Sequence, residues 1–573
     1  MTTADTLNLT REDPTGEGPA TILDALEAAA RAPEGFNFHS GRGELIEALG
    51  YAALVEQSRA LAAKLIGAGV KLGDHVALIA DTEGDFVRLF FACAYAGVVP
   101  APMPLPMAFG GREGYVAHVR RMIEASDASA AFAPAMMRDW LKEAAEGLPL
   151  RLVGTIADLA EVQPSTAPLP TPDPDALAYL QFSSGSTRFP KGVSVTHRSL
   201  MANAAAISRH GLQTRPGDRC VSWLPFYHDM GLVGFMLSPI VAGLTGDYLA
   251  TRDFARRPLL WLQMIARAKA TISYSPSFGY ELAAQRAATV DLGDLDVSCW
   301  RCAGIGGDMI RPHVLRAFAD RFRPHGFDLD RYVASYGMAE ATLALSFAPL
   351  GPGLRTETVD LDRLESDGVA DAAKPGASRT REFVLCGPAL PGHELAARGP
   401  DGSALPARRV GKIFARGPSL MRDYFREPEA TAETLSPDGW LDTGDLGYFT
   451  HGELVITGRA KDLILVNGRN VWPQDLEWAV EAGVPGVRSG DVAVFSVDRD
   501  EGEEVVALIQ CRTREPAARA ALQDQAAKLL RLQFGTPVVV RLVGAHALPV
   551  TSSGKLSRSR ARELYLSLPA EAA

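Results

Sequence analysis

The sequence has few cysteines and no excess of positive charge. Six cysteines in 573 residues are too sparse for a disulfide framework and favour reduced thiols in a cytoplasmic protein. The formal net charge is -10, with 58 Lys and Arg against 68 Asp and Glu. Because binding to nucleic acid needs a basic surface that neutralises phosphates, this balance argues against nucleic acid as the main partner.

Long uninterrupted apolar runs are also missing. The most apolar stretches, 89–107 and 231–244, contain prolines and fall short of the roughly 20 apolar residues that a spanning helix needs. The first residues show no basic segment followed by an apolar core, so we expect no secretion signal. We therefore expect a cytoplasmic protein without a transmembrane segment.

The remaining composition is that of an ordinary globular protein, with 47% hydrophobic and 22% charged residues. At about 150 residues per domain, the length predicts three or four packed units. Helical patterns at 24–30, 51–68 and 86–96 flank a buried strand pattern at 75–80. This alternation predicts an α/β fold with a parallel sheet.

The most informative stretch is 177–200. An apolar strand pattern at 177–182 leads into a loop of hydroxyls and glycines, after which Thr196 can cap a helix that starts at His197. Glycines and successive N–H donors suit a loop that wraps a phosphate, and the loop also carries cations. Its candidate phosphate-binding residues are Ser183, Ser184, Gly185, Ser186, Thr187 and Lys191.

Two other interpretations of this loop are a P-loop, which fails on particular residues, and a plain surface loop, which stays open. Gly185 and Lys191 have the spacing of a P-loop, but Pro190 replaces its second glycine and Gly192 replaces its magnesium-binding hydroxyl. A plain Ser/Gly surface loop remains an alternative.

The pair Cys299 and Cys302 is a lone C-x-x-C, which we interpret as strand packing.

The loop resembles the phosphate-binding signature of the adenylate-forming superfamily, which includes acyl-CoA synthetases, luciferases and adenylation domains. Arg188 stands where the usual form has glycine, and this departure is similar to the fatty acyl-AMP ligase branch. Ala339, which replaces the common threonine before Glu340, also resembles that branch.

The resemblance implies roles for further motifs. Gly306, Gly307 and Asp308 would form one wall of the adenine pocket, with Tyr336 against the base and Gly337 beside it. Glu340 would ligate the Mg²⁺ that bridges the phosphates of ATP, a task suited to a carboxylate oxygen. Asp445 and Arg459 would hold the ribose, Lys461 would lie at the domain hinge, and Lys555 would reach the active site as the catalytic lysine. His228, a third catalytic candidate beside Lys555 and Glu340, would gate or line the acyl entrance, although an ordinary half-buried histidine fits the same pattern. The apolar stretch 231–244 suits either core packing or the wall of an acyl tunnel.

The resemblance also implies the architecture. We expect a large N-terminal domain, residues 1–458, made of two packed α/β subdomains plus a small β-unit at about 383–455. A small mobile α+β domain, residues 459–573, would carry the lysine. The polar segment at about 349–382 matches an insertion that in fatty acyl-AMP ligases is associated with failure to use CoA; an ornamental surface loop is the alternative.

These motifs predict an enzyme that activates a medium- or long-chain fatty acid with ATP and Mg²⁺. The acyl group would then pass from acyl-adenylate to the phosphopantetheine thiol of a separate acyl carrier protein. An acyl-CoA synthetase is the alternative enzyme, and a catalytically silent nucleotide- or acyl-binding protein is the alternative of another class. A serine hydrolase is disfavoured, because no G-x-S-x-G occurs.

Overall fold

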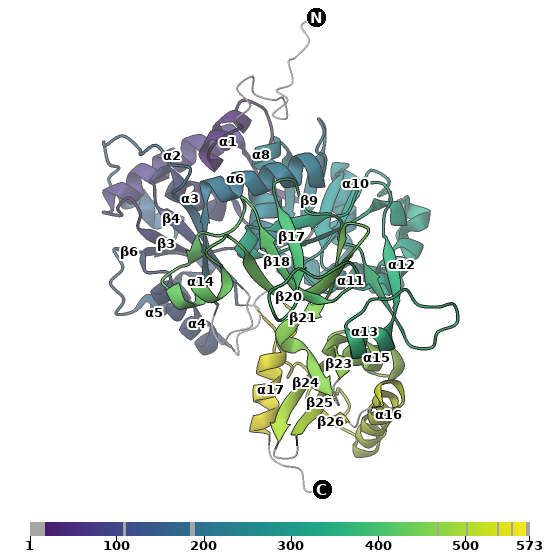
Figure 1. Ribbon diagram of the computed structural model, residues 1–573. Coiled ribbons are helices and arrows are strands. Elements are labelled where there is room, and N and C mark those ends of the chain that lie inside the picture. Colours follow the sequence, from purple (N-terminus) through teal and green to yellow (C-terminus); the bar gives the residue numbers. More distant parts are fainter. Residues whose placement is uncertain are drawn as a thin grey trace, which may run out of the picture.

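The computed structural model describes residues 18–106, 111–183, 190–466, 469–499, 502–535, 538–551 and 554–568. It has a large body that contains two sheets with mainly parallel strands and a smaller body built from the C-terminal residues (Figure 1). The mixed α/β fold with a small C-terminal domain, expected from the sequence, is confirmed.

The larger sheet has eight strands. Neighbouring strands are parallel except for the pair at each edge of the sheet, which is antiparallel. In spatial order the strands are β14 (Ala344–Phe347), β13 (Tyr332–Gly337), β12 (Cys302–Ile305), β11 (Ile272–Ser275), β9 (Arg219–Ser222), β10 (Thr245–Leu249), β1 (Gly35–His39) and β2 (Leu45–Gly50). The second sheet is entirely parallel, in the order β4 (Val99–Met103), β3 (His75–Ile79), β5 (Ala128–Phe132) and β6 (Leu152–Gly154). All five residues of β3 are buried, as the continuous apolar pattern predicts for a strand covered on both faces.

Helices cover both sheets. They are α1 (Ile22–Ala29), α2 (Tyr51–Gly67), α3 (Gly84–Tyr95), α4 (Arg112–Ala125), α5 (Arg138–Ala145), α6 (His197–Ala206), α7 (Asp229–Gly231), α8 (Ser238–Ala242), α9 (Thr251–Arg256), α10 (Leu259–Ala268), α11 (Ser277–Ala287) and α12 (Pro312–Phe322). The predicted cap of α6 is present, because the Thr196 side chain accepts a hydrogen bond from the Ser199 backbone N–H. Within the described residues, no helix combines the length and the apolar character that crossing a bilayer requires.

Two segments of this body are π-helical. The π turn Ile207–Gly211 continues α6, and a second one, Leu232–Leu237, joins α7 to α8. In the second segment Val233, Phe235 and Met236 are packed in the core, and Gly234 and Phe235 also line a large cavity. Core packing of the apolar stretch is therefore confirmed, whereas its use as the wall of an acyl tunnel stays a prediction.

Smaller antiparallel units complete the large body. The strands on either side of the candidate phosphate loop, β7 (Leu177–Phe182) and β8 (Gly192–Thr196), pair with each other, and β8 also pairs with β19 (Asp423–Tyr424). The β-unit contains β17 (Glu394–Arg398), β18 (Gly411–Arg416), β20 (Leu441–Thr450) and β21 (Glu453–Arg459), next to α14 (Pro428–Thr434).

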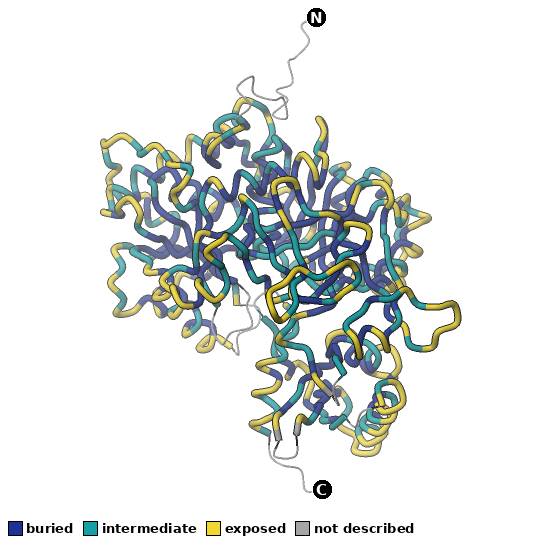
Figure 2. Tube along the Cα trace, in the orientation of Figure 1, coloured by how far each residue is buried: buried dark blue, intermediate teal, exposed yellow. Residues whose placement is uncertain are grey.

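The small body begins with the hairpin β22 (Ile464–Val466) and β23 (Arg469–Val471). It continues with α15 (Pro473–Gly483), β24 (Val492–Arg499), β25 (Gly502–Gln510), α16 (Pro516–Phe534), β26 (Val538–Val543) and α17 (Arg558–Ser567). It has a core of its own, visible as a separate buried region in Figure 2.

Two of the candidate motifs adjoin or lie in strands. Ala303, Gly304 and Ile305, directly before Gly306, belong to strand β12, where Gly304 makes room for the Tyr274 ring of the adjacent strand. The segment Thr443–Asp445 lies within β20, where a register shift accommodates Gly444 at φ +72°. One local expectation needs a partial correction. Cys302 packs in β12 as expected, whereas Cys299 lies before the strand and is half-buried; both thiols are free.

The segment 349–382 is more structured than its polar composition suggests. It contains β15 (Thr356–Asp360) and α13 (Leu361–Asp367), and β16 (Thr380–Val384) begins at its end. Val359 and Leu364 are fully buried in a cluster that also contains Trp472 of the small body. A few apolar residues among many charged ones were enough to anchor the segment.

Candidate active site

A cavity of about 1330 Å³ lies between the large and small bodies. Residues from both bodies line it, including Ser183, Lys191, His228, Gly307, Asp308, Tyr336, Gly337, Glu340, Asp445, Arg459, Lys461 and Lys555. Motifs that are spread over almost 400 positions of the chain thus meet at one place. Ser184, Gly185, Ser186 and Thr187 lie outside the described residues.

Gly306 is the exception among the described candidates, because it does not line the cavity. A Cβ at this position would lie 2.9 Å from the Ser335 carbonyl oxygen of the neighbouring strand. Gly307, with φ +82°, turns the chain toward the cavity next to Met230. Gly306 therefore acts indirectly, because its lack of a side chain lets the chain beside the cavity pack closely on the neighbouring strand.

At one end of the cavity, the two ends of the phosphate loop are held together. The Ser183 backbone N–H donates to the Lys191 carbonyl oxygen at 2.9 Å, because β7 and β8 pair directly beneath the loop. The Lys191 ammonium lies 4.8 Å from the centre of the Tyr424 ring. A fixed cation thus faces the cavity where the sequence predicts phosphates.

Glu340 stands on a short helical turn directly after β13. Its carboxylate accepts a hydrogen bond of 2.8 Å from the Tyr424 hydroxyl, and its carbonyl oxygen accepts one from the Met421 N–H. Burial raises the pKa of Glu340, whereas the Tyr424 hydrogen bond acts to lower it. The next residue but one, Thr342, has φ +68°, which a β-branched residue rarely adopts, and its hydroxyl is bound to the Ser419 carbonyl. Such strain is typical of a functional turn.

Asp445 is held by two neighbours. The Tyr336 hydroxyl donates to one carboxylate oxygen at 2.7 Å, and Nε of Arg459 lies 3.6 Å from the other. Burial raises the pKa of Asp445, and Arg459 acts in the opposite direction. Asp308, on the opposite wall, has its pKa raised to about 6 by burial, although it accepts hydrogen bonds from Ser277.

Lys555 reaches this cavity from the segment between β26 and α17 of the small body. Burial lowers its pKa, and the negative charge of Asp229 partly opposes that shift. The Asp229 pKa lies below its usual value, because His228 and Lys555 outweigh the effect of its own burial. His228 Nδ1 lies 2.6 Å from Asp229 Oδ1. A cation of the small body and an acid of the large body therefore line the same cavity.

Sequence reasoning missed Asp229 and Tyr424. Asp229 directly follows His228, so its position in the same short motif could have revealed it. Tyr424 lies 84 positions after Glu340, and only strand β19, which is two residues long, brings it to the carboxylate. No local pattern could have predicted that pair.

The junction between the bodies carries a buried ionic cluster. Arg558 donates to Glu477 at 2.8 and 2.6 Å and to Asp462 at 2.8 Å. Burial lowers the pKa of Lys461, and Arg459 lowers it further. The predicted hinge lysine thus lies among charges that belong to both sides of the junction.

Part of the cavity lining is apolar. We call this part the apolar arm and define it by six lining residues, Ile207, Leu212, Phe235, Tyr274, Leu343 and Phe347. The Tyr274 ring lies 6.1 Å from that of Phe235 and 6.2 Å from that of Phe347. The cavity therefore combines a charged chamber with a hydrophobic arm, a shape suited to a substrate with one anionic and one apolar end.

Comparisons with known proteins agree with this geometry. The AMP-binding enzyme family matches residues 27–425. A protein of Caulobacter vibrioides named "Putative acyl-CoA synthetase" is 55% identical over 546 residues, which cover 95% of each chain. The medium-chain-fatty-acid–(acyl-carrier-protein) ligase of Moorena producens is 31% identical over 572 residues, which cover 96% of this chain and 95% of the relative. A solved structure from a study of fatty acyl-adenylate ligases of E. coli and L. pneumophila has a TM-score of 0.91 and 42% identity, covering 95% of this chain and 97% of that one. This chain therefore belongs to the AMP-binding, adenylate-forming enzymes, and its homologues are fatty acyl-AMP ligases and acyl-CoA synthetases.

Proposed function

We propose that this protein converts a medium- or long-chain fatty acid and ATP into acyl-adenylate and pyrophosphate, and then passes the acyl group to the phosphopantetheine thiol of a separate acyl carrier protein. Fatty acid activation through an adenylate follows from its family. The observation that supports the rest of the proposal is a single cavity that joins the apolar arm to Glu340, Asp445 and Lys555. We also propose residues 1–458 and 459–573 as the two domains.

In the first half-reaction, a carboxylate oxygen of the fatty acid attacks the α-phosphorus of ATP. The bond from that phosphorus to the bridging oxygen of the β-phosphate breaks, and pyrophosphate leaves with the electron pair. Lys555 would neutralise the negative charge that gathers between the two anions, and Lys191 would hold the departing phosphates. Asp445 would accept hydrogen bonds from the ribose, with Tyr336 against the base.

The residues present fit a magnesium ion that arrives with the nucleotide. Mg²⁺ is commonly held by one or two carboxylates together with substrate phosphates, and Tyr424 links the Glu340 carboxylate to Lys191 at the end of the phosphate loop. Among the described residues no cluster of three or more metal-ligating side chains occurs, which agrees with an ion that takes most of its ligands from ATP and water. Bound there, it would supply positive charge at the phosphates.

In the second half-reaction, a thiol sulfur attacks the acyl carbonyl carbon and AMP leaves. We propose that the segment 349–382 selects the carrier over free CoA by limiting the movement of the small domain. Two contacts with the small body support this role. Glu365, which is only 2% exposed and pairs with Arg379 of the same segment at 2.9 Å, also pairs with Arg469 of the small body. Arg381, near the start of β16, lies 3.0 Å from Asp475 of the small body.

An acyl-CoA synthetase that uses the same adenylate is the second candidate. Its specific support is the name of the Caulobacter vibrioides relative, with 55% identity over almost the whole chain. The two candidates share the first half-reaction and differ only in the thiol that receives the acyl group.

The deciding experiment incubates the purified protein with ATP, Mg²⁺ and a panel of fatty acids, and then adds either CoA or a phosphopantetheinylated carrier protein. Mass spectrometry identifies the products. We expect acyl-adenylate that transfers to the carrier and not to CoA. Efficient formation of acyl-CoA would instead establish the synthetase and leave the segment 349–382 without the proposed role.

A further inference from the structure

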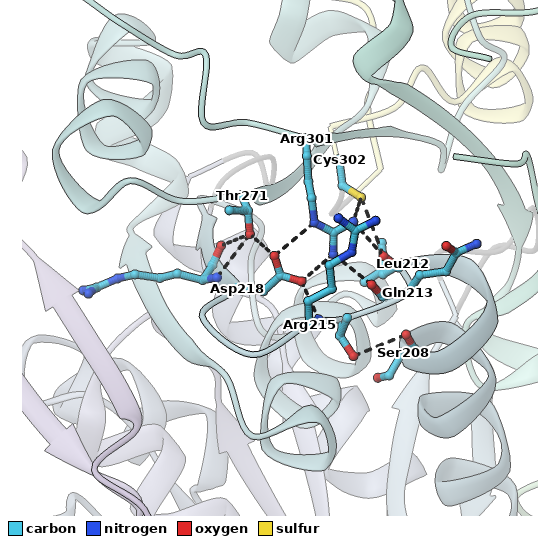
Figure 3. A network of polar contacts seen from close by, with 10 residues as sticks. Ser208, Leu212, Gln213, Arg215, Asp218, Thr271, Arg301 and Cys302 are labelled. Carbon is cyan, nitrogen blue, oxygen red and sulfur yellow. Dashed lines mark hydrogen bonds and ion pairs between the residues drawn. The ribbon is translucent and has the colours of Figure 1, made fainter. Parts of the chain in front are cut away.

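Arg301 and Asp218 form an ion pair, and neither residue lines the cavity. Figure 3 shows the polar contacts around this pair. Arg301, just before β12, donates from Nε to Asp218 at 3.0 Å and makes a second bond to the same carboxylate from Nη2. The Thr271 hydroxyl and the Arg215 backbone N–H also donate hydrogen bonds to the Asp218 carboxylate, each at 2.7 Å. The Asp218 side chain is 4% exposed and that of Arg301 16%, so the pair is largely withdrawn from water.

The same guanidinium binds the end of the π turn that follows α6. Its remaining N–H groups donate to the carbonyl oxygens of Leu212, at 3.0 Å, and Gln213, at 3.1 Å. The last carbonyl oxygens of a helix have no hydrogen-bond donors within the helix. Here the Arg301 side chain, just before β12, provides donors for two carbonyl oxygens at the helix end. Gln213 has φ +46°, an unusual conformation that needs such support.

This anchoring sets the position of two lining residues. Ile207 and Leu212 both face the apolar arm, and the Leu212 N–H donates to the Ile207 carbonyl at 2.7 Å across the π turn. Between them, Gly211 packs so closely on Phe347 that an added Cβ would lie 2.9 Å from that ring. The segment before the turn is fixed separately, by two hydrogen bonds between Asn203 and Ala344. The π turn is therefore held on both sides. Asn203 fixes the helix before it, and Arg301 fixes the residues after it.

We propose that the Arg301–Asp218 pair is a positioning device that sets the acyl-chain selectivity of the enzyme. By holding Ile207 and Leu212 against the apolar arm, the pair fixes the space available for the acyl chain. Neither residue touches the substrate; both act through the π turn. This inference rests on the proposed function, because it concerns the fatty acid that the arm would receive.

The test measures adenylate formation with a homologous series of saturated fatty acids, from short to long chains, for the wild-type protein and for Arg301→Lys. Lysine keeps the positive charge but cannot hold the carboxylate and two carbonyls together. We expect the preference of kcat/KM for the best acid over the acid two methylenes longer to fall by about tenfold, since hydrophobic pockets discriminate by about that factor for small changes in chain length. The KM for ATP should stay within about twofold, because the nucleotide residues are not contacted.

A matched control lies at the other end of the same helix. Arg198 makes an equally bidentate pair with Asp175, at 2.6 and 2.8 Å, but both side chains are exposed and neither lines the cavity. Arg198→Lys should leave the chain-length profile unchanged. Asp218→Asn is the second variant in case Arg301→Lys does not fold, and it should broaden the profile in the same way.

Hydrogen exchange of residues 207–215 gives a readout that does not depend on turnover. We expect faster exchange there in Arg301→Lys than in Arg198→Lys. A wild-type protein with a sharp chain-length profile that Arg301→Lys retains would overturn this inference and leave the proposed function intact. A uniform loss of kcat for all acids would show a merely structural role and overturn it as well. If the wild-type protein forms no adenylate with any fatty acid, both proposals fail together.

Discussion

The Tyr424 hydroxyl donates a hydrogen bond of 2.8 Å to the carboxylate of Glu340 and so joins strand β19 to the turn after β13. The Tyr424 ring also lies beneath the Lys191 ammonium, at 4.8 Å. One side chain therefore links the candidate metal ligand to the candidate phosphate-binding lysine, and it offers a way to test both roles.

Tyr424→Phe should shift the acidic limb of the pH profile to higher pH. Burial raises the pKa of Glu340 and the Tyr424 hydrogen bond acts against that shift, so without the hydroxyl the pKa rises further. Since the ionised carboxylate is the form that binds Mg²⁺, a higher pH is then needed to reach full activity. The measurement is kcat/KM for ATP against pH at fixed Mg²⁺.

Tyr448→Phe is the matched control, because Tyr448 is fully buried, its hydroxyl has no hydrogen-bond partner among the described residues and it does not line the cavity. Its profile should coincide with that of the wild-type protein. An acidic limb that stays in place in Tyr424→Phe would remove Glu340 from the group of residues that must be ionised.

Lys555→Ala should lower the rate of adenylate formation by about 10²–10³-fold, comparable with the loss of one oxyanion-stabilising donor, while ATP binding stays largely intact. The measurement is single-turnover formation of acyl-adenylate, together with calorimetric binding of ATP. An unchanged single-turnover rate would show that this lysine takes no part in the chemistry.

We also expect Lys555 to set an upper pH limit on activity. Burial lowers the pKa of Lys555, so the protonated form is lost at a pH below the ordinary range for lysine, and kcat/KM should fall as the pH rises through that value. In Lys555→Arg the cation stays protonated, and the alkaline limb should move to higher pH at a lower overall rate. A limb that is identical in both proteins would assign the titration to another group.

Asp445→Asn should weaken nucleotide binding. The carboxylate is oriented by Tyr336 and Arg459, and exchanging a charged acceptor for an amide costs on the order of 1.5–3 kcal/mol per hydrogen bond. We expect the KM for ATP to rise by about 10–100-fold, with a smaller effect on the KM for the fatty acid. Equal effects on both substrates would indicate damage to the whole cavity.

Arg469→Met should loosen the contact between the segment 349–382 and the small body. It removes the partner that Glu365 has in the hairpin β22–β23, but Arg379 still neutralises that buried carboxylate. We expect adenylate formation within about twofold of wild type and transfer to CoA raised by about tenfold, within the usual range of coupling between two elements. Arg416→Met, which breaks an exposed pair with Glu394 inside the β-unit, is the control.

Local motifs explain why so much of the site could be predicted from sequence. Each of the groups around Lys191, Asp308, Glu340 and Asp445 is contiguous, and strand–turn patterns identified the elements that carry them. The capped helix at His197 and the strands of the small body were predictable for the same reason, since capping residues and apolar periodicity are local.

Tertiary pairing explains the rest. The approach of Asp229 to Lys555 joins positions more than 300 residues apart, and Thr443–Asp445 became part of a strand only because β18 and β21 lie on either side of it. In the segment 349–382, four apolar residues are buried among many polar ones, because they pack against residues distant in the chain, among them Tyr448, Val455 and Trp472. Arg301 gave no sequence signal, since nothing near it in the chain indicates the helix end that it caps.

The six free thiols also make this molecule convenient for spectroscopy. Cys93, Cys220, Cys302, Cys386 and Cys511 are buried, and only Cys299 is half-exposed. Once Cys299 is replaced, cysteines introduced at exposed sites in the two bodies would react with maleimide dyes almost alone. Single-molecule energy transfer between such dyes could then test whether the two bodies move relative to each other during turnover, without rebuilding the core to remove the native thiols.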